Sequence, residues 1–148
     1  MFVVDTDVLS LTSPASKLDT DAVARWRDWV RKNRQDIFLS SITIMEVRFG
    51  IENLRVRGAE ARASALRQWL LAAETVHARR IVPVSTEIAH AAGGLLHKAF
   101  RNGGKPSSED ALIAATADKL GFRLLSRNAK HMRLFGVDFT DPLSNLPD

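Results

Sequence analysis

The feature that most constrains the fold is the start of the chain, where an apolar run ends in acids. Phe2, Val3 and Val4 are followed directly by Asp5, and Asp7 comes two residues later. A continuous apolar run predicts a strand that is buried on both faces. Open α/β sheets bind their ligands at the carboxyl ends of such strands, so we expect Asp5 to lie at a functional edge.

Short apolar runs recur along the chain and alternate with helical patterns. Further strands are expected at residues 37–40, 81–84, 122–126 and, marginally, 137–140. The expected helices cover about residues 20–33, 43–56, 59–78, 86–101 and 107–120. This alternation predicts an α/β fold with a mostly parallel sheet covered on both faces. No linker or repeat interrupts residues 1–148, so one domain is expected. Pro83 indicates that its strand either lies at a sheet edge or ends early.

Several helix boundaries are marked by capping residues. Asp7 is expected to cap a short helix near the N-terminus. Thr43 with Glu46, and Ser107 with Asp110, have the spacing that opens a helix. A glycine pair at residues 93–94 lies inside a helical pattern, which indicates either close packing against another element or a kink.

Composition excludes some classes of protein. The 148 residues are 45% apolar, enough for a sizeable core, and they contain no cysteine, which rules out disulfides and thiolate metal sites. The net charge of +4 suits a nucleic-acid partner, although a merely soluble basic protein fits equally well. No run reaches the ~18 apolar residues of a membrane span, so a cytoplasmic protein without membrane contact is expected.

Four polar residues stand at the ends or starts of the expected elements. Asp5, Glu46 and Asn128 follow strands or begin the helices after them, so a parallel sheet would bring them to its carboxyl edge. Asp110 begins a helix that precedes a strand, so topology alone places it at the opposite end. Each acid also has an ordinary reading, as a partner of turn amides or of a helix N-terminus.

Four segments that contain these residues resemble the blocks of the PIN-domain ribonucleases of the VapC and FitB type. They are residues 3–10, 39–51, 110–117 and 124–128. The resemblance implies a PIN-like three-layer α/β/α sandwich with a mostly parallel central sheet of four to five short strands. It also implies that Asp5, Glu46 and Asp110 converge and bind Mg²⁺ or Mn²⁺, which would bring Asp110 to the site.

The chain departs from the family pattern at two positions. Asp7 replaces the usual Asn and adds a negative charge near the metal, and Asn128 stands where some members have a fourth acid. Because Asn128 cannot act as a base, we expect it to orient a water or a phosphate oxygen beside one bound ion. Thr6 and Ser126 are expected to support the acids through their hydroxyls, although ordinary turn roles fit them too.

Cations near the acids are candidates for binding a phosphate backbone. Residues 98–133 hold eight Lys or Arg against three acids. A solvated surface would explain each of these residues singly, whereas as a group they suit RNA. The proposed substrate-binding residues are Arg48, Arg127, Lys130 and His131.

The resemblance implies a metal-dependent endoribonuclease that is the toxin of a type II toxin–antitoxin pair. An RNA substrate, a cognate antitoxin whose C-terminal segment covers the site, and a homodimer would accompany that function. Two alternatives stay open. One is a non-catalytic PIN-like module that binds RNA or a partner, and the other is a haloacid-dehalogenase-like phosphatase with Asp5 as nucleophile and Asp7 as acid/base.

Overall fold

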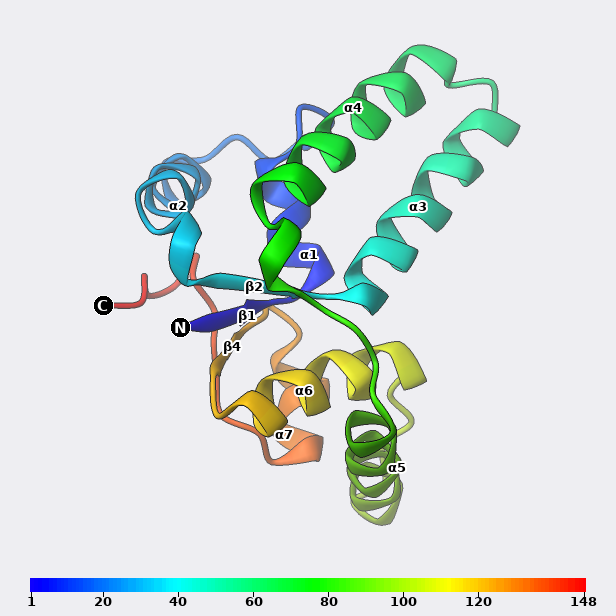
Figure 1. Ribbon diagram of the computed structural model, residues 1–148, viewed down its shortest axis with the longest axis vertical. Helices are drawn as coiled ribbons and strands as arrows, with labels where there is room; N and C mark the ends of the chain where they lie inside the picture. Colours follow the sequence, from blue (N-terminus) through cyan, green and yellow to red (C-terminus); the bar gives the residue numbers. More distant parts are fainter.

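A parallel sheet of five short strands lies at the centre of the chain (Figure 1). The computed structural model describes residues 1–148 and orders the strands β3-β2-β1-β4-β5. Their bounds are β1 Phe2–Val4, β2 Ile37–Ser40, β3 Ile81–Val82, β4 Arg123–Leu125 and β5 Phe139–Thr140. β1 is central, as its continuous apolar run predicts, and the Pro83 strand lies at an edge, as expected.

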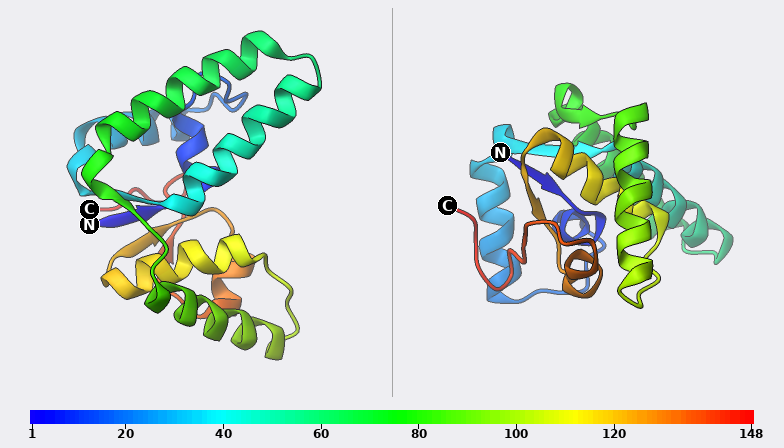
Figure 2. Two further views of the ribbon diagram at one scale, coloured as in Figure 1. Left: turned by 45° about the vertical axis from the view of Figure 1, so that its right-hand side comes forward. Right: turned by 90° about the horizontal axis from the view of Figure 1, so that it is seen from below.

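Helices cover both faces of the sheet and complete the predicted three-layer sandwich (Figures 1 and 2). Val3 and Val4 point to opposite faces, because successive side chains of a strand alternate. Val4 belongs to the apolar cluster under α1 (Thr6–Leu9) and α2 (Asp21–Lys32). Val3 belongs to the cluster under α5 (Thr86–Arg101), α6 (Ser108–Leu120) and α7 (Ala129–Phe135).

A helical hairpin projects from the sheet between β2 and β3 (Figure 1). It consists of α3 (Ser41–Val56) and α4 (Glu60–Val76), which pack on each other around Val47, Ile51 and Leu70. Three short 3₁₀ helices lie elsewhere, η1 (Ser10–Thr12), η2 (Arg34–Asp36) and η3 (Ala78–Arg80). The hairpin lies beside α1 and η1, and the groove between them is described below.

The residues that cap the helix starts agree only in part with those predicted from the sequence. Ser107 caps α6 by accepting the N–H of Asp110 at 3.1 Å, as predicted. The predictions that Asp7 caps the first helix and that Thr43 caps the third are wrong. Asp5 accepts the N–H of Thr6 at 2.7 Å and Ser40 that of Ile42 at 3.2 Å, so both helices begin directly where their strands end.

Two further features differ from expectation. The seven residues of α7 were expected only as the segment after β4, because a helix this short has little periodic pattern. Gly93 and Gly94 lie exposed in a continuous α5, and a Cβ at either would meet no atom within 4 Å. Close packing within the chain therefore does not explain them. Among all the helices, none combines the length and apolarity that a membrane span requires.

Candidate active site

Asp5 occupies the carboxyl end of the central strand and is almost fully buried, with 4% of its surface exposed. Its Oδ1 accepts the Thr6 N–H at 2.7 Å, and its Oδ2 accepts the Ser126 hydroxyl at 2.6 Å. The Asp5 N–H in turn donates to the Leu125 carbonyl at 2.9 Å. The pairing of β1 with β4 therefore fixes the orientation of this carboxylate.

Glu46 reaches the same edge from the second turn of α3. Thr6 Oγ1 donates to Glu46 Oε1 at 2.5 Å, so one residue touches two acids, through its amide and its hydroxyl. Because α3 begins at the end of β2, its early turns lie at the carboxyl edge. The placement predicted for Glu46 is confirmed, although its expected role in a capping box is not.

Asp110 also lies at this edge, and the expectation from topology that it lies at the opposite end is wrong. Asn128, which follows β4, donates from Nδ2 to Asp110 Oδ2 at 3.2 Å. α6 leads through Gly121 directly into β4. A helix that ends where a strand begins, and runs back along it, must have started near that strand's carboxyl end.

Asp110 has a second side-chain partner, His131. From the sequence, His131 was expected only as a substrate-binding residue, and this contact was not predicted. Its Nδ1 lies 2.6 Å from Asp110 Oδ2 and 2.8 Å from Asn128 Nδ2. Nδ1 cannot donate to the acid and accept from the amide at once, and the shorter contact with a carboxylate favours donation to Asp110. The signal in the sequence was the spacing of Asn128 and His131. Residues three apart lie on the same face of a helix, so their side chains can meet.

The three acids Asp5, Glu46 and Asp110 line a cavity of about 520 Å³, and no apolar residue lines it. Its walls are Asp5, Thr6, Asp7, Glu46, Asp110, Arg127 and Asn128. The acids do not close around a single point, and each is held by its own hydrogen-bond donor. The arrangement is an open acidic basin with one cation, Arg127, on its wall.

Three acids of the basin, Asp5, Asp7 and Glu46, have raised pKa values and are hard to ionise. Burial raises the pKa of Asp5, and the charge of Asp110 raises it further, against the opposing hydrogen bonds from Ser126 and Thr6. Burial also raises the pKa of Glu46, with smaller contributions from the neighbouring carboxylates. The pKa of Asp7 is raised to about 6 by burial and by Asp5, while Arg127 opposes the shift.

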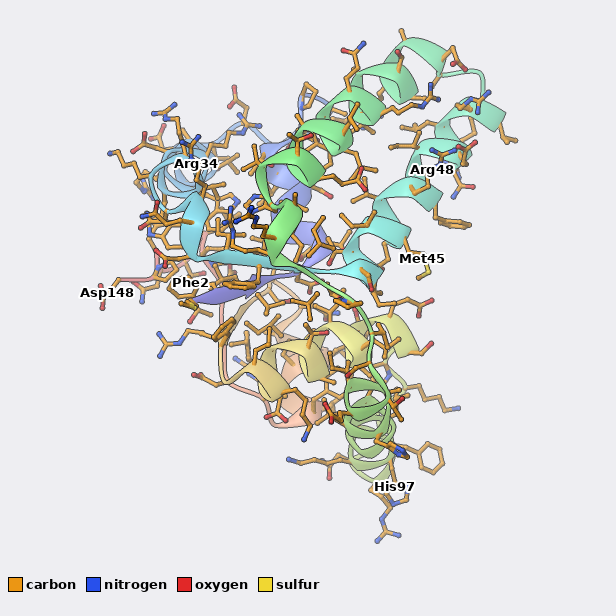
Figure 3. All side chains as sticks on the ribbon, in the orientation of Figure 1. Phe2, Arg34, Met45, Arg48, His97 and Asp148 are labelled. Atoms are coloured by element: carbon orange, nitrogen blue, oxygen red, sulfur yellow. The ribbon has the colours of Figure 1, made fainter.

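The structure brings together only part of the predicted substrate-binding set. Arg127 lines the basin, and His131 faces Asp110 instead of open space. Arg48 points away along α3 and pairs with Glu52 at 2.7 Å (Figure 3). Lys130 is exposed on α7 and makes no ion pair.

Comparison with known proteins finds one family over most of the chain. The family model described as PIN domain matches residues 2–135. VapC ribonuclease Y4jK of Sinorhizobium fredii (strain NBRC 101917 / NGR234) is 28% identical over 145 residues, which cover 96% of this chain and 97% of that protein.

Solved structures share the fold. The crystal structure of FitAcB from Neisseria gonorrhoeae superposes with a TM-score of 0.81 at 25% identity and covers 96% of this chain and 98% of its own. The structure of VapBC2 from Rickettsia felis, bound to a DNA fragment from its promoter, gives a TM-score of 0.64 at 19% identity over 94% of this chain and 96% of its own. At that identity the second likeness concerns the fold alone.

Proposed function

The chain belongs to the PIN domain family, and on that basis we propose that it is a metal-dependent endoribonuclease, the cytoplasmic toxin of a toxin–antitoxin pair. One observation carries the proposal: Asp5, Glu46 and Asp110 come from distant parts of the chain and face one polar basin. The relative described as a VapC ribonuclease supports cleavage of RNA. The likeness to the FitAcB structure supports an antitoxin partner.

The basin fits a hard divalent ion such as Mg²⁺ or Mn²⁺. Its donors are carboxylate oxygens, which such ions prefer, and its open form leaves room for the waters that Mg²⁺ retains. Burial and mutual repulsion raise the pKa of Asp5 and of Glu46, so a bound cation would relieve an existing cost. A bound ion of this kind lowers the pKa of a coordinated water and stabilises charge on the attacked phosphate.

The chain's own residues hold the acids in position. Ser126 and Thr6 fix the carboxylates of Asp5 and Glu46. Asn128 was expected to orient a water or a phosphate oxygen, but its amide donates to Asp110 and its carbonyl oxygen caps α7. We therefore assign Asn128 to positioning Asp110.

Two groups complete the proposed site. His131 supports the carboxylate of Asp110 as a donor that keeps one oxygen of this proposed ligand in place. Arg127, on the basin wall, offers a cation to a phosphate of the RNA.

A partner protein and a homodimer both need exposed apolar surface. The α3–α4 hairpin offers it, since Phe49 and Leu71 are 68% and 65% exposed. We propose this hairpin as the source of such interfaces. Trp26 is buried in the core, so α2 offers less.

The test is cleavage of a structured RNA with Mg²⁺ and with EDTA. Wild type is expected to cut only with the metal, and Asp5→Asn and Asp110→Asn are expected to lose cleavage. Asp118→Asn is the matched control, because Asp118 is an exposed acid on the same helix as Asp110. Mutants of Asp5 and Asp110 that cut as fast as wild type would show that the assigned site is wrong.

The two alternative functions predict other outcomes of the same experiment. A non-catalytic module would bind the metal and the RNA without any cleavage. A phosphatase would release phosphate from a small phosphomonoester and leave RNA intact. Either result would replace the ribonuclease proposal.

A further inference from the structure

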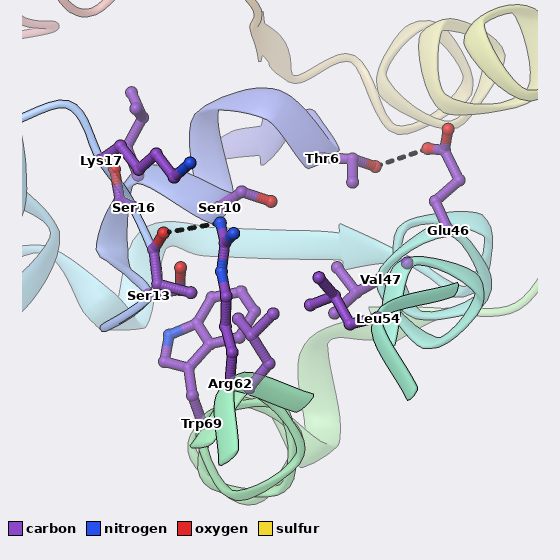
Figure 4. A pocket seen from close by; sticks show the side chains of 14 residues that line it. Thr6, Ser10, Ser13, Ser16, Lys17, Glu46, Val47, Leu54, Arg62 and Trp69 are labelled. Carbon is purple, nitrogen blue, oxygen red and sulfur yellow. Dashed lines mark hydrogen bonds between the residues drawn. The ribbon is translucent and has the colours of Figure 1, made fainter. Parts of the chain in front are cut away.

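A second cavity adjoins the acidic basin and has no part in the function proposed above. It is a groove of about 460 Å³ between the α1–η1 segment and the α3–α4 hairpin (Figure 4). Thr6 and Glu46 line both this groove and the basin, and the hydrogen bond between them at 2.5 Å lies at the border of the two cavities. A polymer with one phosphate at the acids could therefore extend across this border into the groove.

One part of the groove is suited to an anion. Lys17 and Arg62 bring two cations to it, and Ser10 and Ser13 add hydroxyls (Figure 4). Ser13 lines the groove with only 4% of its surface exposed, and its hydroxyl is not among the buried side-chain oxygens that lack a partner, so it offers a polar atom to the groove. Arg62 donates one N–H to the Ala15 carbonyl at 3.1 Å, and its other N–H groups remain available to a ligand.

The adjoining wall is apolar and contains an aromatic ring. Leu54, Leu66 and the indole of Trp69 line this side of the groove. Bases stack on aromatic side chains whatever their sequence, because every base has a π-face. A volume of about 460 Å³ also lies in the range of roughly 300–1,000 Å³ that small-ligand pockets occupy.

We propose that this groove is a nucleotide subsite for the RNA, seating the nucleotide next to the scissile phosphate. Its base would lie against Trp69, and its phosphate on Lys17 and Arg62, while Thr6 and Glu46 mark the passage to the acids. The proposal rests on the proposed ribonuclease function and deepens it. The groove thus adds two cations for the strand to Arg127 of the acidic basin.

Gly50 provides a way to close the groove without disturbing the fold. It lies in the interior of α3, lines the groove, and a Cβ there would meet no atom within 4 Å. Leucine at this position gains helix propensity, so Gly50→Leu is expected to fold. Gly93→Leu is the matched control, since Gly93 is equally open on α5 and outside the groove.

The experiment measures binding of a short fluorescein-labelled single-stranded RNA in Mg²⁺ by fluorescence anisotropy. An Asp5→Asn background keeps the RNA intact. Gly50→Leu is expected to weaken binding by about tenfold, the effect of a lost stacking surface, whereas Gly93→Leu leaves it unchanged. Lys17→Gln and Arg62→Gln are each expected to lower the slope of log affinity against log salt by about 0.7. Arg67→Gln is the control, because Arg67 lies on α4 with Arg62 but outside the groove, and it is expected to leave the slope unchanged.

The outcomes separate this proposal from the one it rests on. With Asp5 restored, Gly50→Leu is expected to raise the KM for RNA cleavage more than it lowers kcat. If Gly50→Leu binds RNA as tightly as Gly93→Leu does, the subsite is refuted even though cleavage persists. If Gly50→Leu instead binds RNA normally and loses only the binding of the antitoxin, the groove is a site for a protein partner and the proposal is refuted. Wild type that binds RNA but never cleaves it would refute the ribonuclease function alone.

Discussion

Replacing Asp7 with asparagine tests whether the acidic basin costs the protein stability. Asp7 lines the basin beside Asp5, and its pKa is raised from 3.8 to about 6 by burial of the carboxyl and by the charge of Asp5. A carboxyl whose pKa is raised in the folded state favours folding when protonated. That contribution is full below pH 3.8 and is lost as the pH rises through about 6.

The size of the effect follows from this shift. Each pKa unit corresponds to 1.36 kcal/mol, so a rise from 3.8 to about 6 gives at most about 3 kcal/mol. Asp7 is exposed as a residue, and solvent screens its charge, which reduces the expected value to about 1 kcal/mol. Asparagine is close in shape and carries no charge. Asp7→Asn is therefore expected to stabilise the metal-free protein by about 1 kcal/mol at neutral pH.

The assay is urea unfolding in EDTA at pH 8 and at pH 4. Asp7→Asn is expected to raise the free energy of unfolding at pH 8 and to have little effect at pH 4. In thermal melts the gain corresponds to about 2–4 °C. Asp28→Asn is a control of opposite sign, because Lys32 lies 2.7 Å from Asp28 and holds its pKa below the usual range. That variant is expected to lose stability at pH 8.

Equal effects of Asp7→Asn at the two pH values would refute the electrostatic reasoning. They would show that asparagine changes the packing or the helix propensity of α1 instead. Saturating Mg²⁺ provides a second check. Since a cation in the basin offsets the repulsion between Asp5 and Asp7, the gain from the substitution is expected to shrink when the metal is added.

Three further predictions follow from the same contacts. Stabilisation by Mg²⁺, read from thermal melts, is expected to fall as the pH is lowered from neutrality, because the raised pKa values of Asp5 and Glu46 let protons compete with the metal earlier than at ordinary carboxyls; a constant shift in melting temperature would contradict the assigned ligands. His131→Ala is expected to weaken Mg²⁺ binding about tenfold in calorimetry, while His97→Ala, on exposed α5 surface, leaves it unchanged; equal affinities would remove His131 from the site. Trp26→Phe is expected to cost about 2–3 kcal/mol in urea unfolding, because the buried Val8 carbonyl loses the indole N–H that donates to it at 3.0 Å; an unchanged midpoint would mean that water replaces this donor.

Local patterns in the sequence predicted the elements that depend on neighbouring residues. The apolar run before Asp5 indicated the central strand, and the expected helix over residues 107–120, with Ser107 at its start, matches α6. The limits of α5 also agree with its periodicity. These features are local because a helix cap or an apolar stripe needs only a few adjacent residues.

The position of Asp110 needs more than a local pattern. A helix that connects parallel strands runs back along them and begins at their carboxyl edge, and the prediction for Asp110 applied this rule only to helices that follow a strand. The resemblance to PIN-domain ribonucleases placed Asp110 correctly, whereas reasoning from strand order alone did not. Helix α7 was not predicted for a different reason, since seven residues are too few to show a helical period.

Patterns in the sequence were enough to identify the acids at the ends of elements, and hence the candidates Asp5, Glu46 and Asp110. The donor that holds each acid depends on tertiary packing. Ser126 lies 121 residues from Asp5 and Thr6 lies 40 residues from Glu46, yet both pairs are in hydrogen-bond contact. Strand pairing and helix packing create these contacts, because they bring together side chains whose separation along the chain carries no information about their distance.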